Sequence, residues 1–311
     1  MRKYLVLVLI FSLCAINVVS AQLLYKISGN GLEKPSYIFG THHLLGGGEQ
    51  FIDTLPHLRR VMSEAEQFCW EINAEEMARA QQVLVQHVAN NAGLPKGMSI
   101  RDLFTAKEFA KIDAATKEII GVGFDELSQA YKEDINSCVP MFYHLILLGN
   151  YKMAKGKVNN ADTKAIDHYL VEYAKLSGKE LLGLEKVEAQ IPVLWPLQIP
   201  LREQKKILLY MLDNYDKTIL LEDKITEAYL SQDVEALRDI VYDKKFVRVN
   251  AFTKQNLKKM FHDREVVWVE QMPEIMRKKS TFFFVGSGHL VGKPGVLELL
   301  RRKGYTVEPM Q

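Results

Sequence analysis

The 311-residue chain has little cysteine, almost no net charge and none of the common short catalytic signatures. Of its three cysteines, Cys14 lies in an apolar N-terminal run, and Cys69 and Cys138 have no Cys-x-x-Cys spacing, which disfavours a metal site built on thiolates. In an exported protein the latter two could form a disulfide. Because both lie in apolar or helix-like sequence, two buried thiols are an equal alternative.

The near-absence of net charge limits the classes of partner. The sequence has 40 Lys and Arg residues against 38 Asp and Glu residues, a formal net charge of +2, and no basic stretch is interleaved with aromatic residues. We therefore expect no nucleic-acid partner and no attraction to an anionic membrane surface. Hydrophobic residues make up 48% of the chain, so a globular domain with a substantial core is expected.

Four familiar enzyme signatures are missing from the sequence. It contains no Gly-x-Ser-x-Gly elbow, no phosphate-binding Gly-x-x-x-x-Gly-Lys, no His-Glu-x-x-His and no Gly-x-Gly-x-x-Gly. These absences argue against a serine hydrolase of the elbow type, a P-loop nucleotide binder, a zincin and a Rossmann dinucleotide-binding enzyme.

The first 21 residues are predicted to be a secretory signal peptide. Two basic residues precede an apolar run over residues 4–16, which is short for a membrane span, and residues 19–21 place small side chains before a cleavage site. We therefore expect the mature chain to begin at Gln22 and the protein to be exported to the periplasm or the extracellular space, with no other membrane association. An uncleaved N-terminal anchor is the alternative.

Two short segments near opposite ends of the chain resemble each other. Residues 37–46, Tyr-Ile-Phe-Gly-Thr-His-His-Leu-Leu-Gly, align without gaps with residues 283–292, Phe-Phe-Val-Gly-Ser-Gly-His-Leu-Val-Gly. In both, an apolar run that is typical of a buried strand ends in a Gly-x-x-His unit. Polar residues that follow such strands often carry the chemistry of α/β proteins. The repeat therefore suggests that His43 and His289 lie in one site.

The surrounding pattern predicts an α/β fold. Strand–Gly-x-x-His–helix–strand occurs twice, which indicates pseudo-duplicated βαβ units in one central mixed sheet, within a single domain over residues 22–311. Between the units, residues of about 74–278 are mainly helical in periodicity and form a large insertion. The predicted strands span residues 23–28, 36–39, 67–72, 180–183, 281–285 and 305–307.

Each histidine has several possible roles. A histidine after a strand can bind a metal, act as a general base or make a structural hydrogen bond, and the last role is the commonest for a single residue. The duplicated context favours His43 and His289 acting together, for example as ligands of a divalent cation that also needs a carboxylate. His42 has no counterpart in the second segment, where Gly288 stands, so we assign it a supporting or surface role.

Two glutamates and one arginine are candidate partners of the histidines. Glu71 ends an apolar strand, where an acid is costly to bury unless it is paired or binds a metal. Glu185 follows the predicted strand at residues 180–183, although it could equally be an N-terminal helix residue stabilised by the helix dipole. Arg264 begins the helix before the last Gly-x-x-His unit, and from local sequence alone an exposed salt bridge is the simpler interpretation.

Several blocks in the right order resemble the TraB/GumN family, which is related to the Tiki metalloproteases. The family's pattern is resembled at both Gly-x-x-His units, in a central block and at the end of the chain. These blocks are Gly40–His43, Asp167, Ala174-Lys175, Gly178-Lys179, Gly183–Gln190, Gly286–Gly292 and Gly304–Val307. Arg264 falls where the family has an arginine, but Glu265 replaces the more usual asparagine.

The resemblance implies a metal-dependent hydrolase site on a pseudo-repeated α/β sheet. It implies that His43, His289 and Glu71 bind manganese, cobalt or zinc, that Glu185 is a ligand or general base, and that Arg264 stabilises an oxyanion. The leading hypothesis is an exported peptidase acting on a peptide or small-molecule substrate. The alternatives are a non-catalytic protein that binds a peptide or small ligand, and an esterase-like hydrolase.

Overall fold

The computed structural model describes residues 22–43, 45–55, 57–131, 134–157, 165–249, 253–292 and 294–310. The predicted signal peptide lies outside the described residues, and the predicted export stays a prediction. Within the described ranges, none of the helices combines the length and the apolar character needed to cross a membrane.

A six-stranded mixed sheet confirms the predicted α/β fold. The strands are β1 (Leu24–Ser28), β2 (Ser36–Thr41), β3 (Gln67–Trp70), β4 (Glu180–Gly183), β5 (Thr281–Gly286) and β6 (Thr306–Pro309). Their order across the sheet is β4-β3-β5-β2-β1-β6. The neighbours β4, β3, β5 and β2 are parallel, whereas β1 is antiparallel to both β2 and β6.

The two duplicated segments lie side by side at the centre of this sheet. Strand β5 pairs with β2 in parallel, with Gly40 opposite Val285 and Thr41 opposite Gly286. Strand β5 therefore separates β2 from β3, so the first βαβ unit has a strand from the other end of the chain inserted into it. Both Gly-x-x-His units consequently leave the sheet at the same edge.

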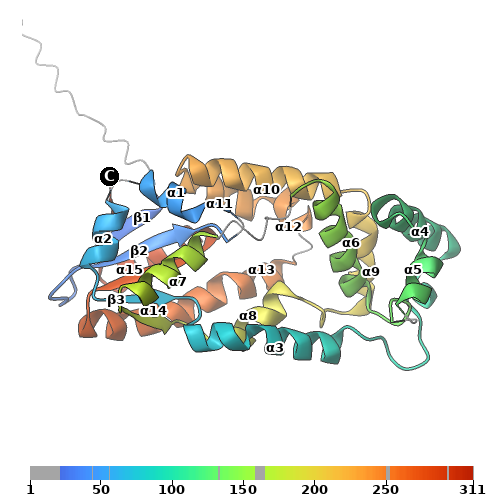
Figure 1. Cartoon of the computed structure of the whole chain (residues 1–311), viewed down its shortest axis with the longest axis horizontal. Coiled ribbons are helices and arrows are strands. Elements are labelled where there is room, and N and C mark those ends of the chain that lie inside the picture. Colours follow the sequence, from blue (N-terminus) through green and yellow to red (C-terminus); the bar gives the residue numbers. More distant parts are fainter. Residues whose placement is uncertain are drawn as a thin grey trace, which may run out of the picture.

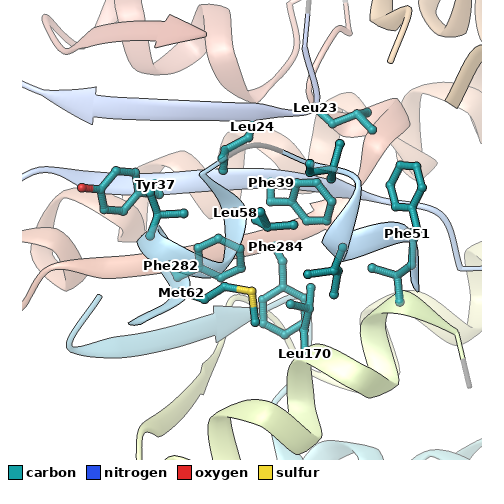
Figure 2. Packing of buried hydrophobic residues seen from close by; sticks show 14 of the residues in the cluster. Leu23, Leu24, Tyr37, Phe39, Phe51, Leu58, Met62, Leu170, Phe282 and Phe284 are labelled. Atoms are coloured by element: carbon teal, nitrogen blue, oxygen red, sulfur yellow. The ribbon is translucent and has the colours of Figure 1, made fainter. Parts of the chain in front are cut away.

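One face of the sheet packs on the first helices and on α7 (Ile166–Leu176). Side chains alternate along β5, so Phe282 and Phe284 point to this face and Phe283 to the other. Figure 2 shows Phe282 and Phe284 beside Leu58, Met62 and Leu170. Helices α1 (Gly48–Asp53), α2 (Leu58–Glu64) and α7 bury much of this face, and Tyr229 and Leu237 from later helices join the same core. The single helix expected between the first Gly-x-x-His unit and the next strand is thus two helices, with His57 at a positive φ of 70° before α2.

The other face is covered by α14 (His262–Lys278) and α15 (Val296–Arg302). Trp268 and Met272 of α14 and Leu300 of α15 pack on Phe283 and Val285. The connection from β2 leads to β3 on one side, and the connection from β5 leads to β6 on the other, so the two run in opposite directions across the sheet. The helices in the two connections cover opposite faces of the sheet. Ligands of α/β proteins bind where such crossovers diverge, beyond the carboxyl ends of the strands.

The insertion is mainly helical, as predicted, but it also supplies edge strand β4. In Figure 1 the sheet lies at one end of the elongated molecule, and α4, α5, α6 and α9 lie at the other. This far end has its own apolar core. The helices of the insertion, besides α7 and α14, are α3 (Ala74–Asn91), α4 (Ala106–Ile120), α5 (Phe124–Ala130), α6 (Pro140–Ala154), α8 (Val187–Leu194), α9 (Leu201–Met211), α10 (Tyr215–Leu230), α11 (Val234–Tyr242), α12 (Lys244–Val249) and α13 (Lys254–Met260).

Cys69 and Cys138 are free and buried, which excludes the disulfide alternative in this structure. Cys69 lies in β3 against the α14 face of the sheet, whereas Cys138 belongs to the separate core of the helical insertion. Burial raises the pKa of the Cys138 thiol to about 12 and raises that of Cys69 further, so both stay protonated at neutral pH.

Candidate functional site

Two glycines bring the ends of β2 and β5 close enough to form one site. A Cβ added to Gly40 would lie 2.6 Å from Leu290 Cδ1, and one added to Gly286 would lie 2.7 Å from His43 Nε2. Each Gly-x-x-His unit therefore needs its glycine because the other unit packs against it. We use the name strand-end site for the cluster of His43, Glu71, Asp167, Glu185, Arg264, Glu265 and His289.

His43 is held by one buried carboxylate and faces another. Its Nδ1 lies 3.0 Å from Asp167 Oδ2, and Thr41 donates to the other Asp167 oxygen at 2.6 Å. Its Nε2 lies 3.7 Å from Glu71 Oε1, and half of the side-chain surface, 50%, is exposed in a deep concavity. Although desolvation favours the neutral ring, the charges of Asp167 and Glu71 raise the pKa of His43 to about 9.

His289 has the opposite electrostatic environment. It is buried, and its Nδ1 lies 3.0 Å from Glu265 Oε1 while Arg264 Nη1 lies 3.2 Å from its Nε2. Arg264 can only donate hydrogen bonds, so His289 Nε2 is the acceptor. The proton of the neutral ring therefore lies on Nδ1, which donates a hydrogen bond to Glu265. Burial and the adjacent guanidinium lower the pKa of His289 to about 3.

Glu265 is a fully buried carboxyl group beside His289. Its second oxygen, Oε2, has no hydrogen-bond partner among the described residues. Burial raises the pKa of Glu265 to about 9, against the opposing effect of Arg264. The group is therefore a neutral acid at pH 7, which explains how a carboxyl with one unpaired oxygen is tolerated inside the protein.

Arg264 links the two halves of the strand-end site, and all five of its N–H groups have protein partners. Its Nη2 donates to Glu71 Oε2 at 2.7 Å and to Glu185 Oε1 at 2.5 Å, and its Nε donates to Glu185 at 3.0 Å. Its Nη1 donates to the Met260 carbonyl at 3.1 Å and to His289. The predicted role of Arg264 as an oxyanion donor would therefore require it to give up one of these bonds.

The two glutamates are buried and paired. Gly286 N–H donates to Glu71 Oε1 at 2.8 Å, and the amide of Gln190 donates to both glutamates, at 3.0 Å and 2.9 Å. Trp268 Nε1 adds a bond to Glu185 at 3.2 Å. Burial would raise the pKa of Glu71, but the neighbouring Arg264 and His43 and the Gly286 N–H lower it to about 2. Glu71 is thus a permanent carboxylate and a weak base.

The predicted metal ligands do not fit a divalent cation in this arrangement. In favour of ligation, each histidine holds its Nδ1 against a carboxyl group, which is the usual way to orient a ligating Nε2. However, the guanidinium of Arg264 already occupies His289 Nε2 and one oxygen of Glu71. Within the described part of the chain, no group of three or more His, Cys, Asp and Glu residues is placed to hold a metal ion.

A cavity of about 520 Å³ opens above the strand-end site. Its floor is formed by the ends of β2, β3 and β5 and includes His43, Glu71, Arg264 and His289. Its walls come from the helical insertion and are mostly apolar. The cavity is large enough to bind a small molecule or part of a peptide.

The structure brings together all five residues singled out from the sequence, His43, Glu71, Glu185, Arg264 and His289. Three further partners, Asp167, Glu265 and Gln190, were not assigned to the site from the sequence. Asp167 and Gln190 had one signal, since both lie in the blocks that resemble the family. Glu265 had another, its departure from the asparagine of the family pattern.

Three further histidines make contacts outside the strand-end site. His42 lines the cavity but contacts Thr226 at 3.2 Å and the Tyr229 ring, and burial lowers its pKa to about 4. His87 contacts the Trp195 carbonyl at 2.8 Å, and His144 stacks on Tyr215 in the far core.

Comparison with known proteins supports the resemblance over nearly the whole chain. The sequence pattern of the TraB/PrgY/gumN family matches residues 23–309. This range contains both Gly-x-x-His units, the complete sheet and the helical insertion. No curated protein matches the chain. The chain therefore belongs to the TraB/PrgY/gumN family.

Proposed function

We propose that this chain is a hydrolase that cleaves a peptide bond in the cavity above the strand-end site. The observation that carries the proposal is His43, which reaches from the end of β2 into the cavity with its Nδ1 held by buried Asp167. A base that is oriented by a third group and exposed to a substrate pocket is the arrangement required for proton transfer.

In the proposed reaction, neutral His43 accepts a proton from water through Nε2 as the water attacks the scissile carbonyl. Asp167 keeps the Nδ1–H tautomer in place, and the carboxylate of Glu71, 3.7 Å from Nε2, stabilises the imidazolium that forms. The imidazolium then returns the proton to the leaving nitrogen. Arg264 keeps Glu71 ionised and holds both Glu71 and Glu185 in position.

The same groups could act on an ester, and a non-catalytic binding protein is a second candidate. The second candidate is favoured by Arg264, whose donors are all occupied, and by a cavity with mostly apolar walls. A binding protein would retain ligand affinity without turnover, so the two functions separate in a single assay.

The test is turnover of a peptide library and of matched esters by the purified chain and by a His43→Gln variant. Product formation that the variant loses would support the hydrolase. Saturable binding without any product from the wild-type chain would contradict it.

The metal requirement implied by the resemblance is tested in the same assay. Because Arg264 occupies the predicted ligands, we expect turnover to survive a chelator. Activity that is lost on chelation and restored by manganese, cobalt or zinc would instead support the metal prediction and require Arg264 to move.

A further inference from the structure

We infer that the helical insertion makes the cavity selective for substrates that carry a bulky, uncharged apolar group beside the scissile bond. This inference rests on the proposed function for its reaction but on separate residues for its specificity. The cavity wall opposite the strand ends is built by six apolar side chains from four helices and a helix junction, namely Leu194, Ile225, Leu237, Val241, Met260 and Phe261.

Apart from one ion pair in the wall, charge in the cavity lies on its floor. Among the described lining residues of the wall, Glu222 of α10 is the charged one, and Lys152 of α6 pairs with it. The floor carboxylates are likewise paired with Arg264. A charged substrate group placed against this apolar wall would therefore lack a counter-ion there, and burial of an unpaired charge is strongly unfavourable.

The size of the cavity favours a large group over a small one. A volume of about 520 Å³ exceeds what the reacting bond alone fills, so a methyl side chain would leave much of it empty. Leu237 and Val241 of α11 are only 1% and 7% exposed, because they also pack into the protein core. These walls cannot move in readily to contact a small substrate. An aromatic or branched aliphatic group would instead make van der Waals contacts with the wall side chains.

Ile225 is the position that best controls this space. It is half-buried on α10, lines the cavity and points away from Leu220, which is 54% exposed on the same helix and does not line the cavity. Five residues of helix separate the two by about 140° around the axis. A Trp at position 225 would fill the cavity, whereas a Trp at position 220 serves as the matched control.

The experiment compares paired amide and ester substrates whose acyl groups derive from alanine, phenylalanine, aspartate and lysine. We expect kcat/KM for the phenylalanine substrates to exceed that for alanine by about 10-fold to 200-fold, with the charged pair lowest. Ile225→Trp should remove most of this preference, whereas Leu220→Trp should leave kcat/KM for both substrates as in the wild type. Whether the amide or the ester of each pair is used identifies the bond class.

Binding of the corresponding N-acetyl amino acid amides, measured by calorimetry, keeps the inference separate from the proposed function. Selective binding of the phenylalanine amide without turnover would overturn the hydrolase but support the apolar pocket. Turnover or binding that favours alanine, aspartate or lysine would overturn the inference alone. If Ile225→Trp does not fold, Leu194→Trp at the exposed rim of the cavity makes the same test.

Discussion

The two Gly-x-x-His units share a local sequence and a strand end, yet they hold histidines of opposite character. His43 is half-exposed and lies between the carboxyl groups of Asp167 and Glu71, which raise its pKa to about 9. His289 is buried between a guanidinium and Glu265, and its pKa falls to about 3. Local sequence therefore places each imidazole, but partners from distant parts of the chain decide whether it carries a charge.

Because of this difference, the two histidines have different roles in the site. His43 faces the cavity and can exchange a proton with a bound substrate, whereas His289 has both ring nitrogens occupied. His289 instead ties Arg264 to β5, and Arg264 in turn holds Glu71 and Glu185. A duplicated motif has thus yielded one candidate acid–base residue and one structural hub.

The largest expected effect comes from removing the exposed histidine of the pair. His43→Gln should lower kcat/KM by about 10²-fold to 10⁴-fold, the usual contribution of a general acid–base residue. Because half of the side chain is exposed, the melting temperature should change little. Steady-state kinetics and thermal unfolding measure the two quantities. His168→Gln, at an exposed position of α7, is the control, and equal activity of the two variants would contradict the role of His43.

The second-largest effect is expected from removing Arg264, which contacts the buried His289 and both glutamates. Arg264→Met leaves Glu71 and Glu185 buried without their cation, which should lower the free energy of unfolding by about 3–5 kcal/mol. Urea denaturation measures the loss. In the same variant the pKa of His289, followed by NMR, should rise, since the adjacent positive charge is gone. A stable variant with an unchanged His289 titration would show that the carboxylates do not depend on Arg264.

A smaller effect is expected from a variant that brings the pKa of His43 closer to that of His289. Asp167→Asn removes the charge that most strongly favours protonated His43, so its pKa should fall toward the ordinary value by about 1–2 units. If His43 is the base, kcat/KM of the wild-type chain rises with pH, with its inflection near pH 9, and levels off above that pH. The inflection should move to lower pH in Asp167→Asn but not in Asp53→Asn, an exposed control. An inflection that does not move would exclude Asp167 as the cause.

The smallest effect concerns the carboxyl group next to His289. The pKa of Glu265 is raised in the folded state from about 4.5 to about 9, so this group makes the protein lose stability as pH rises through that interval. Glu265→Gln keeps the acceptor for His289 but does not titrate. The variant should be more stable than the wild type at pH 8, by about 1–2 kcal/mol, and similar to it at pH 4. Chemical denaturation at both pH values measures this, and equal stabilities at pH 8 would mean that Glu265 is not a buried neutral acid.

Much of the fold followed from patterns that are local in the sequence. The predicted strands at residues 36–39 and 281–285 correspond to β2 and β5, because their apolar runs fit a strand that is buried on both faces. The helix expected after the first Gly-x-x-His unit proved to be two helices, and the helix expected after His289 begins only at Val296. These boundaries depend on how the loops pack above the sheet, which periodicity does not contain.

Sequence alone determined that two Gly-x-x-His units end buried strands and that Glu71, Glu185 and Arg264 were their candidate partners. Tertiary structure decided that β5 inserts between β2 and β3 and that Asp167 and Glu265 orient the two imidazole rings. It also decided that Arg264 forms hydrogen bonds with His289 and Glu71, two of the predicted metal ligands. The physical reason is the range over which each kind of interaction acts. Strand and turn preferences act between residues a few positions apart, whereas desolvation and Coulomb interactions depend on distances in space, and Asp167 lies 124 residues along the chain from His43.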